Sequence, residues 1–265
     1  MRGAGAIGIA LSLAIVSACA TAPSPLRSVD TAATNEPQGM MLLTDWGMDD
    51  AVPAAGDVAI AGSQGWRVVY EMMPGSARGW VQQTHDPSAP RSPAHVYDFV
   101  FPEGMVEGHA PATVYYRMAA REVYAAFWWK PSVPFDLGPN GNKIAFLFNG
   151  GGAAGGQQFL ILRRDGLLHV LPEYHGDFRW RAPNINATPV ALGSWHFVEW
   201  YVQLASGTVK WWLDEQLQGH HTDVRNDVAF DMFQISPTFG GNTGAMKRQT
   251  DHYYFDHLRL SIRLP

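Results

Sequence analysis

The stretch Trp195–Asp214, WHFVEWYVQLASGTVKWWLD, decides the fold class of this 265-residue chain. In its first half Val198, Trp200 and Val202 alternate with Glu199, Tyr201 and Gln203, so they fall on one face of an extended strand. Residues 205–207, Ala-Ser-Gly, have the chemistry of a tight turn, because glycine adopts a positive φ at low cost. Residues 208–213 then alternate again. The stretch therefore predicts a β-hairpin.

Short runs of aromatic and β-branched residues that end at Gly, Pro or Asp recur along the whole chain. They cover residues 66–72, 96–101, 122–130, 144–149, 159–164, 167–171, 231–236 and 253–264. The chain has 27 Gly and 18 Pro, and only 16% of its residues are charged, whereas globular proteins average about 25% charged residues. This composition favours an all-β fold. About ten antiparallel strands in one domain of residues 41–265 predict a two-sheet antiparallel β-sandwich, or jelly roll.

The period-2 pattern also assigns side chains to faces of individual strands. In residues 143–149 it predicts Ile144, Phe146 and Phe148 on one face, and Lys143, Ala145, Leu147 and Asn149 on the other. In residues 208–213 it places Val209, Trp211 and Leu213 opposite Lys210 and Trp212. One face of each strand is expected to pack in the core.

The first 40 residues read as a targeting region. Residues 1–18 carry Arg2 and then an apolar stretch, and the sequence Val-Ser-Ala-Cys ending at Cys19 resembles a bacterial lipobox. The interpretation is a lipoprotein signal peptide with lipidation of Cys19, followed by a flexible tether over residues 19–40. The alternative is an ordinary signal peptide cleaved near Ala20 or Ala22. Either kind of signal peptide predicts export. Lipidation further predicts a protein that is anchored in the bacterial cell envelope and touches the membrane only through its N-terminal lipid.

Charge and cysteine content exclude several classes of partner and fold. The formal net charge is −5 and there is no run of Lys or Arg, which argues against nucleic acid as a partner. Cys19 is the one cysteine of the sequence, so no disulfide can form within the chain. We expect a monomer.

Five segments carry a resemblance to a known superfamily. Residues 195–203, 207–214 and 253–261 resemble the C-terminal strands of concanavalin A-like lectin/glucanase domains, and residues 122–130 and 142–147 are similar to strands of its polysaccharide-lyase-like members. Glu215 stands where those relatives have Gly after the Asp of the turn. The resemblance implies a jelly roll, but the superfamily contains lectins, glycosidases, lyases and adhesion modules, so it does not choose the activity.

The residues themselves favour carbohydrate binding in a groove along one sheet. Aromatic rings stack on the apolar faces of sugars, while amides, carboxylates and amines bind the hydroxyl groups. The candidate groove residues are Tyr124, Trp128, Lys130, Lys143, Asn149, Glu199, Tyr201 and Trp212. The first function hypothesis is therefore a lipid-anchored protein that binds polysaccharide.

Two other hypotheses stay open. A polysaccharide lyase needs a Tyr or His base and a cation near a uronate carboxylate, and the candidates for these roles are Tyr124, Lys143, His169 and Tyr201. The glucanase pattern of carboxylates at i and i+2 is absent from the sequence. The third hypothesis is a structural surface module without a ligand.

A structural Ca²⁺ ion near Asp256 is the one cofactor that the sequence suggests. Jelly-roll relatives often hold such an ion where the first and last strands meet, and Asp45, Asp49 or Asp57 could supply further oxygens. No other cofactor is expected.

Overall fold

The computed structural model describes residues 35–70, 77–150, 156–174, 177–178 and 184–264. The predicted signal peptide, Cys19 and residues 20–34 of the predicted tether lie outside the described residues. All the described residues belong to one compact unit. In the described ranges, no helix is long and apolar enough to cross a membrane.

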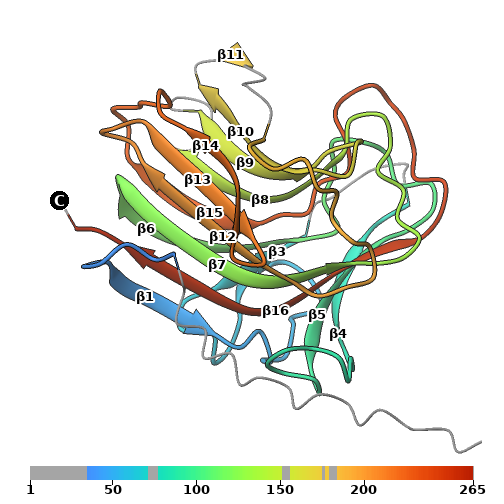
Figure 1. The fold of residues 1–265 in the computed structure, drawn as a ribbon. Helices are drawn as coiled ribbons and strands as arrows, with labels where there is room; N and C mark the ends of the chain where they lie inside the picture. Colours follow the sequence, from blue (N-terminus) through green and yellow to red (C-terminus); the bar gives the residue numbers. More distant parts are fainter. Residues whose placement is uncertain (1–34, 71–76, 151–155, 175–176, 179–183, 265) are drawn as a thin grey trace, which may run out of the picture. The chain divides into compact units, whose positions relative to one another are not determined.

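The regular elements of these ranges are antiparallel strands in two sheets, which confirms the predicted β-sandwich. Sheet A has the order β14-β13-β12-β7-β16-β5-β4, and β1 pairs with the second half of β16 (Figure 1). Its strands are β1 (Met41–Trp46), β4 (Trp80–Thr84), β5 (Val96–Phe101), β7 (Glu122–Pro131), β12 (His196–Gln203), β13 (Thr208–Leu213), β14 (Gln216–His221) and β16 (Asp251–Ile262).

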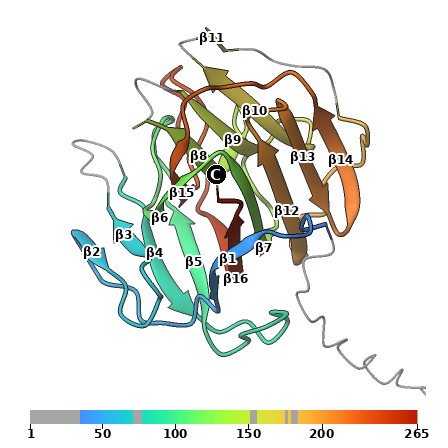
Figure 2. The same ribbon diagram turned by 90° about the vertical axis from the view of Figure 1, so that its left-hand side faces the viewer.

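Sheet B has the order β11-β10-β9-β8-β15-β6-β3-β2. Its strands are β2 (Asp57–Ala59), β3 (Arg67–Val69), β6 (Thr113–Ala120), β8 (Asn142–Asn149), β9 (Gln157–Leu162), β10 (Leu168–Tyr174), β11 (Asp177–Phe178) and β15 (Phe230–Ile235). Strands far apart in sequence are neighbours in both sheets, since β16 lies between β5 and β7 and β15 lies between β6 and β8 (Figure 2).

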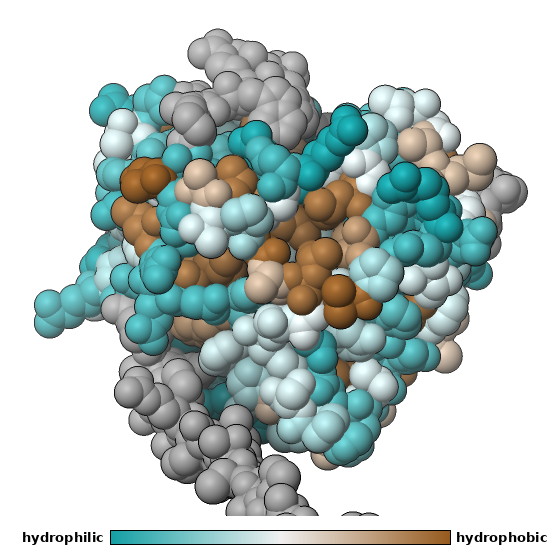
Figure 3. Space-filling model, turned by 45° about the vertical axis from the view of Figure 1, so that its right-hand side comes forward, coloured by the Kyte–Doolittle hydropathy of each residue, from teal (hydrophilic) through white to brown (hydrophobic). Residues whose placement is uncertain are grey.

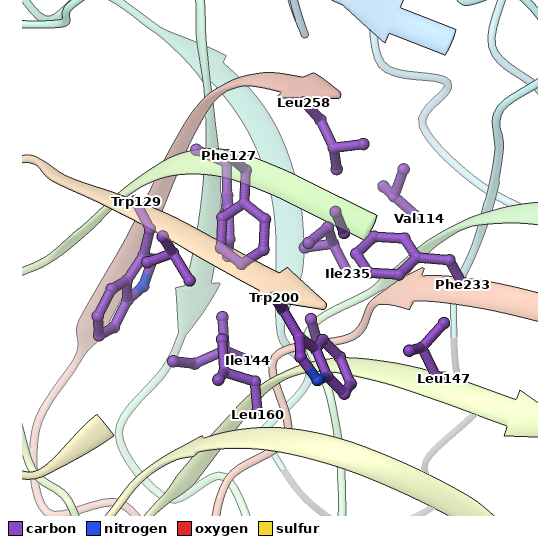
Figure 4. Packing of buried hydrophobic residues seen from close by; sticks show 14 of the residues in the cluster. Val114, Phe127, Trp129, Ile144, Leu147, Leu160, Trp200, Phe233, Ile235 and Leu258 are labelled. Atoms are coloured by element: carbon purple, nitrogen blue, oxygen red, sulfur yellow. The ribbon is translucent and has the colours of Figure 1, made fainter. Parts of the chain in front are cut away.

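The main core fills the space between the two sheets. Phe127, Trp129 and Trp200 come from sheet A, while Leu147 and Phe233 come from sheet B (Figure 4). The rings of Trp200 and Phe233 lie 6.5 Å apart, centroid to centroid, across the two sheets. Burial of such large side chains is the main stabilising contribution, at roughly 25 cal/mol per Å² of apolar surface.

The β12–β13 hairpin has the predicted faces. Val198, Trp200 and Val202 pack in the main core, as do Val209, Trp211 and Leu213. Its outward residues, Tyr201 and Trp212, belong to a smaller cluster on the outer face of sheet A.

The predicted faces of β8 were partly wrong. Ile144 packs in the main core together with Ala145 and Leu147. Phe146 and Phe148 lie instead in a separate cluster on the outer face of sheet B. The register between β8 and β9 shifts between Lys143 and Ala145, and such a β-bulge places two successive residues on the same face.

Some large apolar side chains remain on the surface. Val133, Ile185 and Met246 are more than half exposed. On one side of the molecule hydrophobic residues gather in a band with hydrophilic residues around it (Figure 3). Apolar patches of this kind are frequent at binding surfaces.

Candidate functional site

Four polar or aromatic side chains form a line across the outer face of sheet A. Tyr254 of β16 is directly opposite Lys130 of β7 on one side and Asp98 of β5 on the other. Asp98 is in turn opposite Gln82 of β4. Residues on either side of Lys130, Tyr254 and Asp98 pack in the core, apart from Pro131, so these side chains point outward. With strands about 4.8 Å apart, this transverse row spans about 14 Å.

Tryptophans extend the transverse row at both ends. Trp80 of β4 is 42% exposed, and its indole Nε1 donates a hydrogen bond to Gln82 at 3.1 Å. Trp195 directly precedes β12 and is half-buried. The Lys130 ammonium lies 5.2 Å from the centre of the Trp195 ring and 4.8 Å from that of Tyr254. Aromatic rings are thus spaced from the edge of the sheet to its centre.

Asp86 holds Lys130 and Trp195 in place. The Lys130 ammonium pairs with the Asp86 carboxylate, and Trp195 Nε1 donates to the same oxygen at 3.2 Å. Burial acts to raise the pKa of Asp86, but hydrogen bonds from Lys130 and Ser88 outweigh it and lower the pKa overall. Asp86 is therefore ionised at neutral pH and its charge is balanced by Lys130.

His252 lies beside the transverse row and completes a polar pair with Asp98. Its Nδ1 is 2.8 Å from Asp98 Oδ1, and its ring stacks on Tyr254 with centroids 5.6 Å apart and planes 3° from parallel. The hydrogen bond with Asp98 raises the pKa of His252. Gln82 Nε2 donates to the other Asp98 oxygen at 2.9 Å, so both Asp98 oxygens are used.

Tyr254 is a hydrogen-bond donor at neutral pH. Burial, followed by the charges of Asp98 and Asp86, raises the pKa of its hydroxyl to about 12. Within the described ranges its hydroxyl makes no hydrogen bond, although its ring contacts both His252 and Lys130. This hydroxyl is available to a ligand.

Five of the predicted groove residues lie elsewhere on the outer face of sheet A. They are Tyr124, Trp128, Glu199, Tyr201 and Trp212. The Tyr124 hydroxyl donates to Glu199 at 2.5 Å, and the Tyr201 hydroxyl donates to Glu122 at 2.9 Å. Tyr124 and Glu199 are fully buried, so they are not directly accessible to a ligand.

Residues 35–40, here the N-terminal strap, cover Glu199 on this face. The backbone N–H and the side-chain Nδ2 of Asn35 donate to the two oxygens of Glu199 at 3.0 and 2.8 Å. Glu36 pairs with Arg259 at 2.8 Å, and Met40 packs against the cluster that contains Tyr124. These residues, assigned to the tether from the sequence, thus contact the sheet.

The remaining predicted site residues, Lys143, Asn149 and His169, belong to sheet B and not to this face. Lys143 Nζ donates to the Gly240 carbonyl at 2.8 Å. Asn149 is buried and donates to the Val228 carbonyl at 2.7 Å. His169 is buried, with Nδ1 2.6 Å from Asn184 Oδ1. The predicted groove and the predicted catalytic set are therefore each split between two sheets, because β8 and β10 pair in the sheet opposite β7 and β12.

Most of the transverse row was missed by the sequence analysis. Lys130 was predicted, but Gln82, Asp98 and Tyr254 were not. The alternation of residues 253–258 indicated on which face of its strand Tyr254 lies. The residues that lie beside Tyr254 on that face are about 120 to 170 positions away in the sequence. No local sequence pattern encodes the register in which their strands pair.

Asp256, the predicted centre of a Ca²⁺ site, has backbone partners. Its Oδ2 accepts the N–H groups of Arg91 at 2.6 Å and Ser92 at 3.0 Å. Asp45 pairs with His257 at 2.6 Å, and Asp57 lies on sheet B. Over the described ranges, no group of three or more His, Cys, Asp or Glu side chains is placed to hold a metal ion. The Ca²⁺ ion stays a prediction from the sequence.

Comparison with known proteins identifies the fold. No protein-family model and no curated protein matches the sequence. Among solved structures, the chain is similar to the alginate lyase Aly36B, with a TM-score of 0.56, 14% identity, and coverage of 83% of this chain and 98% of the lyase. A double mutant of that lyase in complex with alginate tetrasaccharide gives a TM-score of 0.54, 13% identity and coverage of 84% and 98%.

A third similar structure is domain 4 of AbnA, an extracellular arabinanase from Geobacillus stearothermophilus, in complex with arabinotriose. It has a TM-score of 0.53 and 11% identity, and the match covers 84% of this chain and 93% of that domain. The chain thus has the fold of these carbohydrate-active proteins, an all-β sandwich of the concanavalin A-like kind.

Proposed function

We propose that this protein binds a polysaccharide chain across the outer face of sheet A, from β4 to the start of β12. The observation that carries this proposal is the transverse row, which aligns Gln82, Asp98, Tyr254 and Lys130 on four adjacent strands. Tryptophans stand at both of its ends. A sugar chain needs this alternation, because its ring faces are apolar and its edges carry hydroxyl groups.

The neighbouring structures support a sugar ligand. Two of the three contain an oligosaccharide, alginate tetrasaccharide in one and arabinotriose in the other. The row itself offers the Tyr254 hydroxyl as a donor, Gln82 as a polar edge, and the ammonium of Lys130, which Asp86 holds in place. The ligand-facing surface is half-exposed and polar, which suits reversible binding of a hydrated polymer.

Affinity electrophoresis of the full chain against neutral and uronate-containing polysaccharides tests this proposal. Tyr254→Ala and Trp80→Ala each remove one ring from the row. We expect about a two- to twelvefold loss of affinity from either change, since one aromatic contact contributes about 0.5–1.5 kcal/mol. Phe148→Ala, which removes a ring from the outer face of sheet B, is the matched control and should retain affinity. Equal retardation of all three variants and the parent would contradict the proposal, as would no retardation by any polysaccharide.

A second candidate function, polysaccharide lyase, is favoured by one observation. His252 is oriented by Asp98 and stacks on Tyr254, whose hydroxyl is protonated. In a β-elimination, His252 would take the proton α to a uronate carboxylate and Tyr254 would give its proton to the departing glycosidic oxygen. The electron pair of the broken C–H bond then forms the C=C bond of the unsaturated product.

Absorbance of the unsaturated uronate separates the two functions. A lyase forms this product on at least one uronate-containing polysaccharide and loses its activity in His252→Gln. Asp98→Asn should lower kcat and shift the lower-pH limb of the pH–rate profile, because Asp98 sets the pKa of His252. Retardation without product on every polymer would leave binding as the function.

We also propose that the mature protein carries a lipid on Cys19 and resides in the bacterial cell envelope. The support is the lipobox-like sequence before Cys19. Metabolic labelling with a fatty-acid analogue should mark the protein expressed in a bacterium, and Cys19→Ser should abolish the label and release the protein from membranes. Equal labelling of the Cys19→Ser variant would refute this assignment.

A further inference from the structure

Two adjoining cavities lie at one end of the sandwich, between the loop that follows β7, the β9–β10 turn and the loop that precedes β16. The larger has a volume of about 480 Å³, within the range of small-molecule sites. Its described lining residues are Pro139, Asn140, Arg163, Arg164 and Asp165. The smaller, of about 310 Å³, is lined by Asp136, Gly138, Pro139, Arg164, Ala245, Met246 and Arg248. Pro139 and Arg164 line both, and no residue of the transverse row lines either.

The walls of these cavities are positively charged. Arg163 pairs with Asp165 at 2.6 Å. Arg248 forms a bidentate pair with Asp136, at 3.0 Å from Nε and 2.5 Å from Nη2, and this pair holds the pKa of Asp136 well below its usual range. Each of these two carboxylates is thus paired with an arginine. Arg164 is exposed, and in the described part of the chain its guanidinium has neither an ion pair nor a hydrogen bond.

The loops around Arg164 are fixed in place. Gly141 has φ +76°, and a Cβ there would lie 2.5 Å from the Leu162 carbonyl, so the two loops pack backbone to backbone. The β9–β10 turn is closed by the hydrogen bond from Gly166 N–H to the Arg163 carbonyl at 2.9 Å. Asn140 Nδ2 donates to Glu107 at 2.9 Å. A ligand would therefore meet a largely pre-formed site, which lowers the entropic cost of binding.

The cavities also have an apolar side. Pro139 lines both cavities, whereas Ala245 and Met246 line the smaller one, and Met246 is 58% exposed. An arginine with free donors beside an apolar surface suits a molecule with one oxyanion group and one apolar ring face. The volume of the larger cavity accommodates a sugar ring.

We propose that Arg164 and these two cavities form a second binding site, distinct from the transverse row, for a sugar-sized molecule that carries a carboxylate, sulfate or phosphate group. The oxyanion binds the guanidinium of Arg164, whose planar donors match two oxygens of such a group. Arg163 and Arg248 stay paired with their carboxylates and leave the site net positive, with three arginines against two aspartates. The ring of the ligand packs on Pro139 and Met246.

Isothermal titration calorimetry of the full chain at constant ionic strength tests this site with four probes. They are glucuronate, glucose 6-sulfate, glucose 6-phosphate and glucose. We expect at least one anionic probe to bind at least tenfold more tightly than glucose, and the order of the three anionic probes identifies the group that the site prefers. Equal binding of glucose, or no binding of any probe, would overturn the proposal.

Three variants locate the binding. Arg164→Ala should lower the affinity for the preferred probe about tenfold, because it removes a charge-assisted contact. Arg225→Ala removes one exposed arginine at a different turn, near Gly207, and should leave the affinity unchanged. Tyr254→Ala should also leave it unchanged, which separates this site from the transverse row. An unaltered affinity in Arg164→Ala, or a loss in Tyr254→Ala, would place the probe elsewhere and refute the proposal.

Discussion

The buried ion pair between Lys247 and Asp251 supports a quantitative prediction about stability. Both side chains are fully buried, with Lys247 Nζ 2.6 Å from Asp251 Oδ2. Nζ also donates to the Asp136 carbonyl at 2.6 Å and lies 4.1 to 5.0 Å from the centres of three phenylalanine rings. Lys247→Met keeps most of the side-chain volume but removes the charge and its donors. The Asp251 carboxylate then stays buried without its cation.

The expected loss follows from what remains around Asp251. Removing one partner of a buried ion pair typically costs about 3–5 kcal/mol. Asp251 keeps hydrogen bonds from the Asp136 N–H at 2.9 Å and from Gln249 Nε2 at 2.7 Å, so we expect the lower end, about 3 kcal/mol. For a domain of this size this corresponds to a fall in Tm of roughly 6–12 °C. It is a large fraction of a total stability of about 5–15 kcal/mol.

Urea unfolding followed by tryptophan fluorescence measures this loss. Lys210→Met, on the outer face of sheet A, is the control and should change the free energy of unfolding by less than about 0.5 kcal/mol. The double variant Lys247→Met with Asp251→Asn should be more stable than Lys247→Met alone, since no unpaired charge remains. A single Lys247→Met variant as stable as the parent would refute the reasoning from the buried pair.

The other predictions concern pH, packing and the strap. Burial lowers the pKa of His169 to about 4, so the folded state favours its neutral form. The contribution of His169 to the free energy of unfolding should be fully present above pH 6.5 and should be lost between pH 6.5 and 4. Urea titrations at several pH values should show a smaller loss of stability in His169→Gln. Gly219→Ala should destabilise the protein by about 1–3 kcal/mol in the same assay, because its Cβ would lie 1.9 Å from the Trp211 ring; an unchanged midpoint would contradict this packing. Asn35→Ala should cost about 1–2 kcal/mol, since it removes one hydrogen bond to the buried carboxylate of Glu199, and unaltered unfolding would show that the strap does not hold Glu199.

The sequence predicted the fold class and the faces to which many side chains point. It did not predict the β-bulge that interrupts the alternation of side chains in β8. Trp200 and Trp211 alternate strictly with polar or outward neighbours, and the structure places both in the core. Phe146 follows the same rule, yet it lies outside the core because the bulge after Lys143 inverts the faces of β8. A bulge depends on how two strands pair, which the pattern of one strand does not contain.

The candidate site was predictable only in part, for a related reason. Alternation places Tyr124, Trp128 and Lys130 on one face of β7, and in the structure this is the outer face of sheet A. The partners of Lys130 depend on the pairing of β7 with β16 and of β16 with β5. Tyr124 and Glu199 share this outward face, but the N-terminal strap covers Glu199. Local periodicity indicates a face, whereas access to that face depends on segments far away in the chain.

The position of Trp80 on the last strand of sheet A has a consequence for the edge of the sheet. Within the described ranges β4 pairs on one side only, and an exposed strand edge can pair with another chain and promote aggregation. A ligand that contacts Trp80 and Trp195 at the same time would link this edge strand to the centre of the sheet across four strands. Amide hydrogen exchange in β4 should therefore slow when polysaccharide binds, and the unliganded protein should be the form more prone to edge-to-edge association.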